Sequence, residues 1–179
     1  MNLQQQFSTL VDLLRYRAIH QADQTAFIFL QNGETEAGKL TYRELDQQAR
    51  AIAVSLKSIV SMGDRAILLY PSGLEFIAAF LGCLYAGIIA VPVPPPKRNR
   101  FNRRLESIIK DTKTKLLLTT SSVINETEKI FEEKVFTLGS LQCITTDNID
   151  RYQANDWQPP PINSNSLALL QYTSGSTGM

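Results

Sequence analysis

The last residues of the chain combine hydroxyl side chains with glycines at a spacing that suits phosphate binding. Glycine lets the main chain approach phosphate oxygens closely, while hydroxyls and successive backbone N–H groups donate hydrogen bonds to the anion. The spacing fits neither a Walker A loop nor a dinucleotide-binding turn. The pattern therefore predicts another kind of nucleotide phosphate loop, made of Thr173, Ser174, Gly175, Ser176, Thr177 and Gly178.

The same six residues also fit an interpretation without any binding function. A run of Gly, Ser and Thr near a chain end is typical of a flexible tail that binds nothing. The preceding run Leu167–Tyr172 is apolar and predicts a strand that would lead into the loop. The residues of the loop alone leave both interpretations open.

The elements that would position this loop alternate between strand and helix. Arg65–Tyr70 is an apolar run typical of a buried strand, Leu74–Ala86 predicts a buried helix capped by Gly87, and Ile88–Val91 predicts a second strand. Such a crossover is the unit of a parallel sheet with helices on its faces, so the fold class is α/β. The alternation continues with a helix at 103–111, a strand at 115–119, a helix at 122–132 and a strand at 141–145.

The N-terminal part predicts a small hairpin between two helices. Ser8–Ala18 has helical periodicity, and Thr25–Leu30 predicts a strand followed by a glycine-containing turn and a second strand. Thr41 and Glu44 form a T-x-x-E capping box at the start of the next helix.

Two proline-rich segments interrupt the regular pattern. The prolines of Pro92–Pro96 each lack a donor N–H, which predicts a stiff extended connector. Arg151–Ser166 predicts a surface loop, which Trp157 would anchor.

Composition limits the function classes. The chain has 179 residues, enough for one domain, and its 18 basic and 17 acidic side chains give no general attraction to nucleic acid. The uncharged run Phe76–Val91 is shorter than the about 20 residues that a membrane span needs. Cys83 and Cys143 suggest neither a metal pair nor a disulfide, and no secretory signal is visible, so we expect a cytoplasmic protein without a membrane span.

Two further features could carry chemistry. His20 is the only histidine and has no second histidine for a metal site, so we interpret it as a surface residue. The basic run Lys97–Arg104 could contact RNA or an anionic cofactor, but a solvated turn that enters a helix explains it as well.

Three strings, in order along the chain, resemble one enzyme superfamily. LTYRELDQQARAIA spans Leu40–Ala53, a longer match spans Gly63–Arg100, and LALLQYTSGSTG spans Leu167–Gly178. Together they are similar to the adenylate-forming (AMP-binding) acyl ligases, and the last string resembles their signature phosphate loop. The whole pattern looks most like the fatty acyl-AMP ligase branch.

This resemblance implies a fold and an activity. The fold would be the N-terminal subdomain of the adenylate-forming enzymes, and residues 1–179 would form an incomplete AMP-binding domain, truncated in the phosphate loop. Such enzymes join a fatty acid to ATP, with Mg²⁺, and pass the acyl group to a carrier protein or a carrier domain of a polyketide or peptide synthase. Thr173 to Gly178 would hold the β- and γ-phosphates.

The resemblance also limits what we expect of this chain alone. In the family the phosphate loop continues into Pro-Lys-Gly, and the catalytic lysine and the magnesium-binding acid come later, so we assign no catalytic and no metal-binding residue here. We expect the isolated chain to be inactive. The alternatives are a fragment of an acyl-CoA synthetase or an amino-acid adenylation domain, or a non-catalytic remnant that serves as a docking module.

Overall fold

A computed structural model describes residues 7–96, 103–132 and 141–173. Helices and strands alternate along them as predicted. In chain order the elements are α1 (Leu10–His20), β1 (Thr25–Gln31), β2 (Thr35–Thr41), α2 (Tyr42–Lys57), β3 (Arg65–Leu69), α3 (Leu74–Ala86), β4 (Ile89–Val93), α4 (Arg103–Thr112), β5 (Leu116–Thr119), α5 (Ser121–Glu132), β6 (Gln142–Thr145) and the 3₁₀ helices η2 (Thr146–Asn148) and η3 (Arg151–Asp156).

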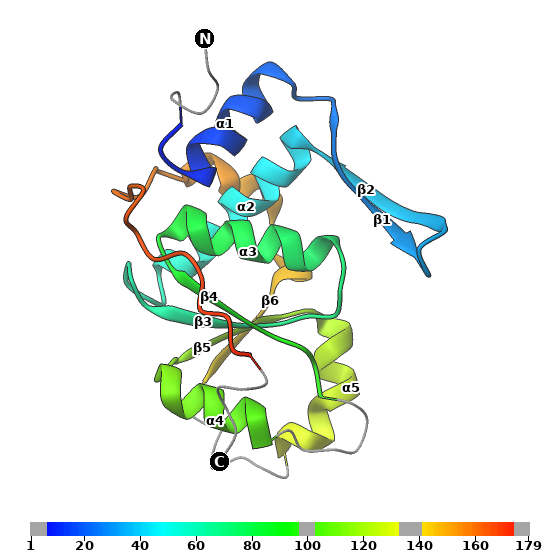
Figure 1. Cartoon of the computed structure of the whole chain (residues 1–179), viewed down its shortest axis with the longest axis vertical. Helices are drawn as coiled ribbons and strands as arrows, with labels where there is room; N and C mark the ends of the chain where they lie inside the picture. Colours follow the sequence, from blue (N-terminus) through cyan, green and yellow to red (C-terminus); the bar gives the residue numbers. More distant parts are fainter. Residues whose placement is uncertain (1–6, 97–102, 133–140, 174–179) are drawn as a thin grey trace.

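Four of the strands form a parallel sheet in the order β4-β3-β5-β6. Helices α1, α2 and α3 lie on one side of this sheet, and α4 and α5 lie on the other (Figure 1). The interior strand β3 and its neighbour β5 are buried almost throughout, as continuous apolar runs covered on both faces require. The predicted α/β fold with a mostly parallel sheet is confirmed.

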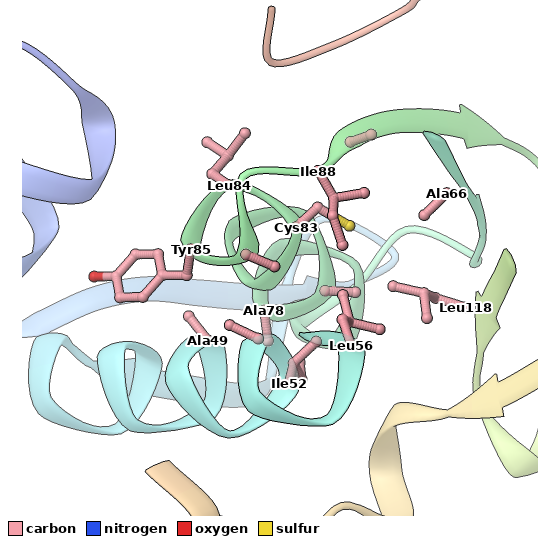
Figure 2. Close-up of a cluster of buried hydrophobic side chains, with 14 of the residues drawn as sticks. Ala49, Ile52, Leu56, Ala66, Ala78, Cys83, Leu84, Tyr85, Ile88 and Leu118 are labelled. Atoms are coloured by element: carbon pink, nitrogen blue, oxygen red, sulfur yellow. The ribbon is translucent and has the colours of Figure 1, made fainter. Parts of the chain in front are cut away.

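The helices cover the sheet with two separate apolar clusters. Ala66 and Leu68 of β3 face the cluster under α2 and α3, whereas Ile67 and Leu69 face the cluster under α4. This alternation follows from the period of two along a strand. Figure 2 shows the first cluster, in which Ile52 and Leu56 of α2 lie against the side chains of α3.

Gly82 of α3 lies directly against Ile52 of α2. A Cβ atom built at this residue would lie 2.5 Å from Cγ2 and 2.7 Å from Cβ of Ile52. Both Ile52 atoms belong to a β-branched side chain with one strongly preferred rotamer in a helix, so they have little room to move. Gly82 is therefore the residue that permits this helix contact.

We expect Gly82→Ala to lower the free energy of unfolding by about 1–2 kcal/mol, because the added methyl group overpacks the contact. The sign is informative, since alanine in a helix interior is normally more favourable than glycine by about 0.5–1 kcal/mol. Urea unfolding measures the effect. In a double variant with Ile52→Ala the added methyl group has room, so the double variant should lose less unfolding free energy than the sum of the losses in the two single variants. Stabilisation by Gly82→Ala alone would contradict the prediction.

The predicted capping box opens α2. The backbone N–H of Glu44 donates to Oγ1 of Thr41 at 3.2 Å, and the backbone N–H of Thr41 donates to Oε2 of Glu44 at 2.8 Å. The hydrogen bonds from the backbone and the hydroxyl of Thr41 hold the pKa of the Glu44 carboxyl below its ordinary value of 4.5. The charged carboxylate therefore stabilises the folded state.

This cap should make part of the stability pH-dependent. Because the folded pKa lies below the unfolded one, the contribution is complete above about pH 5 and is lost as pH falls through the folded pKa. We expect the free energy of unfolding of wild type to exceed that of Glu44→Gln by about 0.5–1 kcal/mol at pH 7 and by less near pH 3. Denaturant titrations at several pH values measure this difference; Glu36→Gln on the hairpin is the control, and a gap that stays constant with pH would contradict the prediction.

The predicted N-terminal hairpin is confirmed as an antiparallel pair of β1 and β2, which extends away from the helices that cover the sheet (Figure 1). The ladder shifts register between Thr25 and Phe27 and again between Phe29 and Leu30. The helix cap at Gly87 is also confirmed, with a φ of 71° and its N–H donating to carbonyls of the last turn of α3.

The prediction that Pro92 starts an extended connector is wrong, because β4 continues through Pro92 to Val93. The N–H of Ile89 points toward the β3 side and donates to the carbonyl of Asp64, the residue before β3, at 2.8 Å. The N–H of Ala90 points away and donates to the carbonyl of Ala168 at 3.0 Å. Pro92 has the same orientation as Ala90, so its missing N–H removes no hydrogen bond from the β3 pair.

Two other predictions in the C-terminal part need correction. Arg151–Ser166 does not begin as an irregular loop, because its first six residues form the 3₁₀ helix η3. Leu167–Tyr172 is not a regular strand and pairs with β4 only through the bridge between Leu169 and Ala90. The predicted anchoring role of Trp157 is confirmed, since its Nε1–H donates to the carbonyl of Tyr85 at 2.9 Å.

A buried carboxylate that the sequence analysis did not single out joins the helices on one face of the sheet. Asp46 in α2 is 2% exposed and accepts hydrogen bonds from Arg15 at 2.7 Å, from Arg50 at 2.9 Å and from the hydroxyl of Tyr85 at 2.9 Å. Arg50 also donates to the carbonyl of Ala154 in η3. One carboxylate thus connects α1, α2, α3 and η3.

Candidate phosphate-binding edge of the sheet

The segment before the predicted phosphate loop lies along the outer edge of β4. The N–H of Ala90 donates to Ala168 at 3.0 Å, and the N–H of Leu170 donates to Ala90 at 2.9 Å, so the segment runs parallel to the strand. Figure 1 shows it, coloured orange to red, passing β4 toward the C-terminus. Thr173 therefore leaves the sheet at its carboxyl edge.

Only the first residue of the predicted loop belongs to the described part of the chain. Thr173 is exposed, directly after the half-buried Tyr172. The other predicted site residues, Ser174, Gly175, Ser176, Thr177 and Gly178, lie outside the described residues, as does most of the basic run Lys97–Arg104. Their role in phosphate binding stays a prediction.

Helix α4 contacts the residue that precedes the loop at two points. Nη2 of Arg104 donates to the main-chain carbonyl of Tyr172 at 2.9 Å, and the hydroxyl of Tyr172 donates to Oδ2 of Asp111. Burial and the neighbouring Asp111 carboxylate raise the pKa of Tyr172 to about 12. The phenol is therefore protonated at neutral pH and remains a donor.

The usual ligand position of an open parallel sheet is occupied here by protein groups. In such sheets ligands bind at the carboxyl ends of two neighbouring strands whose following connections run to opposite faces of the sheet. Here these two strands are β3 and β5. Both carboxylate oxygens of Asp147 accept from the N–H of Ser121 at 3.1 Å, and the hydroxyl of Tyr70 bonds to Thr146 at 2.8 Å. The carboxylate takes the place at the N-terminus of α5 that a phosphate would need.

Two cavities lie elsewhere in the described part of the protein. One of about 390 Å³ lies at the amino end of the strands, beside Gly63, Gly87 and Ala168. The other, of about 260 Å³, lies between α2 and α3 beside Gln48 and Glu75. Neither is lined by Tyr172 or Thr173, so neither cavity reaches the start of the predicted phosphate loop.

Other residues that the sequence analysis considered have structural explanations. His20 is exposed at the end of α1 with its ring against Tyr16, which confirms it as a surface residue. Cys83 and Cys143 are free thiols, and burial raises the pKa of Cys83 to about 12, which makes it unreactive. Within the described ranges, no cluster of three or more His, Cys, Asp or Glu side chains could hold a metal ion.

The run Phe76–Val91 divides into most of α3 and the first residues of β4. Among the described helices, none combines the length and the apolar character needed to cross a membrane.

The described architecture is that of the adenylate-forming enzymes. It superposes on the crystal structure of a fatty acyl-adenylate ligase from L. pneumophila, in complex with acyl adenylate and pyrophosphate, with a TM-score of 0.85 and 40% identity over 97% of this chain and 29% of that one. The predicted N-terminal subdomain of this fold is therefore confirmed.

Residues 14–179 match the family of AMP-binding enzymes, and the chain belongs to this family. It is 49% identical over 175 residues to the medium-chain-fatty-acid–[acyl-carrier-protein] ligase JamA of Moorena producens, covering 96% of this chain and 30% of that protein. It is 35% identical over 175 residues to the 4-hydroxyphenylalkanoate adenylyltransferase of Mycobacterium tuberculosis, covering 95% and 28%. The chain thus spans less than a third of the length of these relatives.

Proposed function

We propose that this chain is the N-terminal part of a fatty acyl-AMP ligase and that residues 1–179 belong to its AMP-binding domain. The complete enzyme would join a fatty acid to ATP, release pyrophosphate and transfer the acyl group to a carrier protein. The names of the relatives support this: JamA is a fatty-acid ligase for an acyl-carrier protein, and the L. pneumophila ligase was crystallised with an acyl adenylate. The free thiol of Cys83 is consistent with a cytoplasmic setting.

Within this proposal, the run Thr173–Gly178 binds the β- and γ-phosphates of ATP. Hydroxyl and backbone donors aimed at these oxygens stabilise the charge that develops on the departing pyrophosphate. The observation that carries the proposal is the position of Thr173, at the carboxyl edge of a parallel sheet directly after the segment that pairs with β4.

Magnesium would neutralise phosphate charge in the complete enzyme. The described residues contain no group of three or more His, Cys, Asp or Glu side chains that could hold a metal ion by themselves. Magnesium at a nucleotide is usually held by one or two carboxylates together with the phosphates. We therefore assign no magnesium ligand to this part of the enzyme.

The first experiment follows the reading frame past the codon for Met179 in the gene and its transcript. The protein encoded by the whole frame is then assayed for exchange of labelled pyrophosphate into ATP, with fatty acids and with amino acids. We expect exchange that depends on a fatty acid, and acyl transfer to a carrier protein. Exchange that depends on amino acids would favour an adenylation domain, transfer only to coenzyme A would favour an acyl-CoA synthetase, and a stop codon after Met179 would contradict the proposal.

The isolated 179-residue chain should bind ATP more weakly than about 1 mM, because an open loop edge supplies only part of a nucleotide site. Isothermal calorimetry measures the affinity, and circular dichroism in the same buffer confirms that the sample is folded. A dissociation constant well below 1 mM would show that the loop acts without the remaining residues of an adenylate-forming enzyme.

A further inference from the structure

Tyr172 is held by α4 at both ends of the residue. Its main-chain carbonyl accepts from Nη2 of Arg104 at 2.9 Å, in the first turn of the helix, and its hydroxyl donates to Asp111, near the helix end. The two anchoring residues are thus almost the length of α4 apart. Together they restrain the position and the direction of Tyr172.

Apolar contacts support the same arrangement. Leu170 and Tyr172 pack against the buried cluster to which α4 contributes Leu105, Ile108 and Ile109. The segment is therefore attached to β4 by the main-chain hydrogen bonds at Ala90 and to α4 by side chains. Thr173 is the next residue.

The geometry of the peptide bond carries this restraint into the loop. The carbonyl of Tyr172 and the N–H of Thr173 belong to one planar trans unit, in which they point in opposite directions. When Arg104 fixes the carbonyl, it also fixes where the N–H of Thr173 points. A glycine-rich loop that starts from a fixed peptide has less conformational entropy to lose when it binds a phosphate.

We infer that Arg104 and Asp111 are positioning residues for the phosphate loop and that they act through Tyr172. This rests on the proposed function, since it assigns the loop to ATP. It also gives one member of the basic run Lys97–Arg104 a role that is neither a solvated turn nor a contact to RNA. Neither anchoring residue needs to touch ATP.

The test uses the protein encoded by the whole reading frame and compares Tyr172→Phe, Arg104→Gln and Arg104→Lys with wild type. Tyr172→Phe deletes one hydroxyl without changing any charge, so it separates positioning from electrostatic attraction of ATP. Lys110→Gln is the matched control, because it removes a positive charge from an exposed position on the same helix. Each variant is assayed for the KM of ATP, the KM of the fatty acid and kcat.

We expect the KM for ATP to rise about fivefold in Tyr172→Phe and about tenfold or more in Arg104→Gln, as the loss of a neutral and of a charged hydrogen bond implies. Arg104→Lys should recover part of the loss. The KM for the fatty acid should stay within about twofold, and Lys110→Gln should behave as wild type. The inference would be overturned if the KM for ATP were unchanged in both Tyr172→Phe and Arg104→Gln. It would also be overturned if the KM for ATP and the KM for the fatty acid rose equally together with a lower Tm.

Hydrogen exchange gives a readout that does not depend on activity. In peptides that contain Tyr172 and Thr173, Tyr172→Phe should accelerate amide exchange about fivefold, whereas peptides from β3 should be unchanged. Unaltered exchange would overturn the inference. If wild type shows no pyrophosphate exchange with any acid, the proposed function fails; faster amide exchange in the variants would then still show that α4 positions this segment.

Discussion

In the complete ligase, replacing Ser174, Ser176 and Thr177 together by alanine is expected to lower ATP–pyrophosphate exchange at least about 100-fold. The three hydroxyls are proposed donors to the β- and γ-phosphates, and their bonds strengthen as charge accumulates on the leaving pyrophosphate. A single preorganised donor of this kind is worth about 10²–10³ in rate. Initial rates at saturating fatty acid, with ATP varied, measure the loss.

Ser164→Ala is the control for this triple variant, because Ser164 is exposed in the segment between η3 and Leu167 and does not belong to the loop. It should leave exchange unchanged. The Tm of the triple variant should lie within about 3 °C of wild type, so that a lower rate reports the loss of phosphate donors and not a loss of the fold. Exchange within about threefold of wild type would show that these hydroxyls do not bind the phosphates.

Replacing Asp46 by alanine is expected to lower the free energy of unfolding by about 3–5 kcal/mol. Asp46 is 2% exposed, and its loss leaves Arg15 and Arg50 without their carboxylate partner beside the core. The hydroxyl of Tyr85, in a fully buried side chain, loses its acceptor as well. For a chain of this size the Tm should fall by roughly 6–20 °C.

Asp23→Ala is the matched control, because the Asp23–Arg43 pair has the same chemistry at the surface, with side-chain exposures of 89% and 63%. Such a pair is worth less than about 1 kcal/mol. Scanning calorimetry of both variants makes the comparison. Equal losses of unfolding free energy in Asp46→Ala and Asp23→Ala would show that burial does not set the strength of the interactions of Asp46 with Arg15, Arg50 and Tyr85.

Patterns of neighbouring residues predicted much of this fold. The T-x-x-E box at Thr41 and the glycine at Gly87 define helix ends through contacts within a few residues, and both are as predicted. Apolar runs likewise placed β3 and α3. The resemblance of LALLQYTSGSTG to a phosphate loop identified the family, because that string carries its chemistry in consecutive residues.

Errors occurred where a residue's environment comes from distant elements. Pro92 continues β4 because its nitrogen lies on the side away from β3, which the sequence does not show. Leu167–Tyr172 forms only a bridge, although its apolar pattern suits a full strand. Asp46 was missed, although its spacing of four residues from Arg50 and its place beside Leu45 were visible signals of a charge on an inward-facing helix surface.

The sequence by itself therefore determined the type and order of most elements, the helix caps at Thr41 and Gly87 and the family, while phosphate binding by Thr173–Gly178 stays a prediction. All of these depend on neighbouring residues, through hydrophobic period, backbone hydrogen bonds and glycine geometry. Only the tertiary structure decided that α4 contacts Tyr172, the residue before the predicted loop, because Arg104 and Asp111 lie 68 and 61 residues from Tyr172. Contacts at such separations depend on how the sheet is ordered, and no local pattern encodes that order.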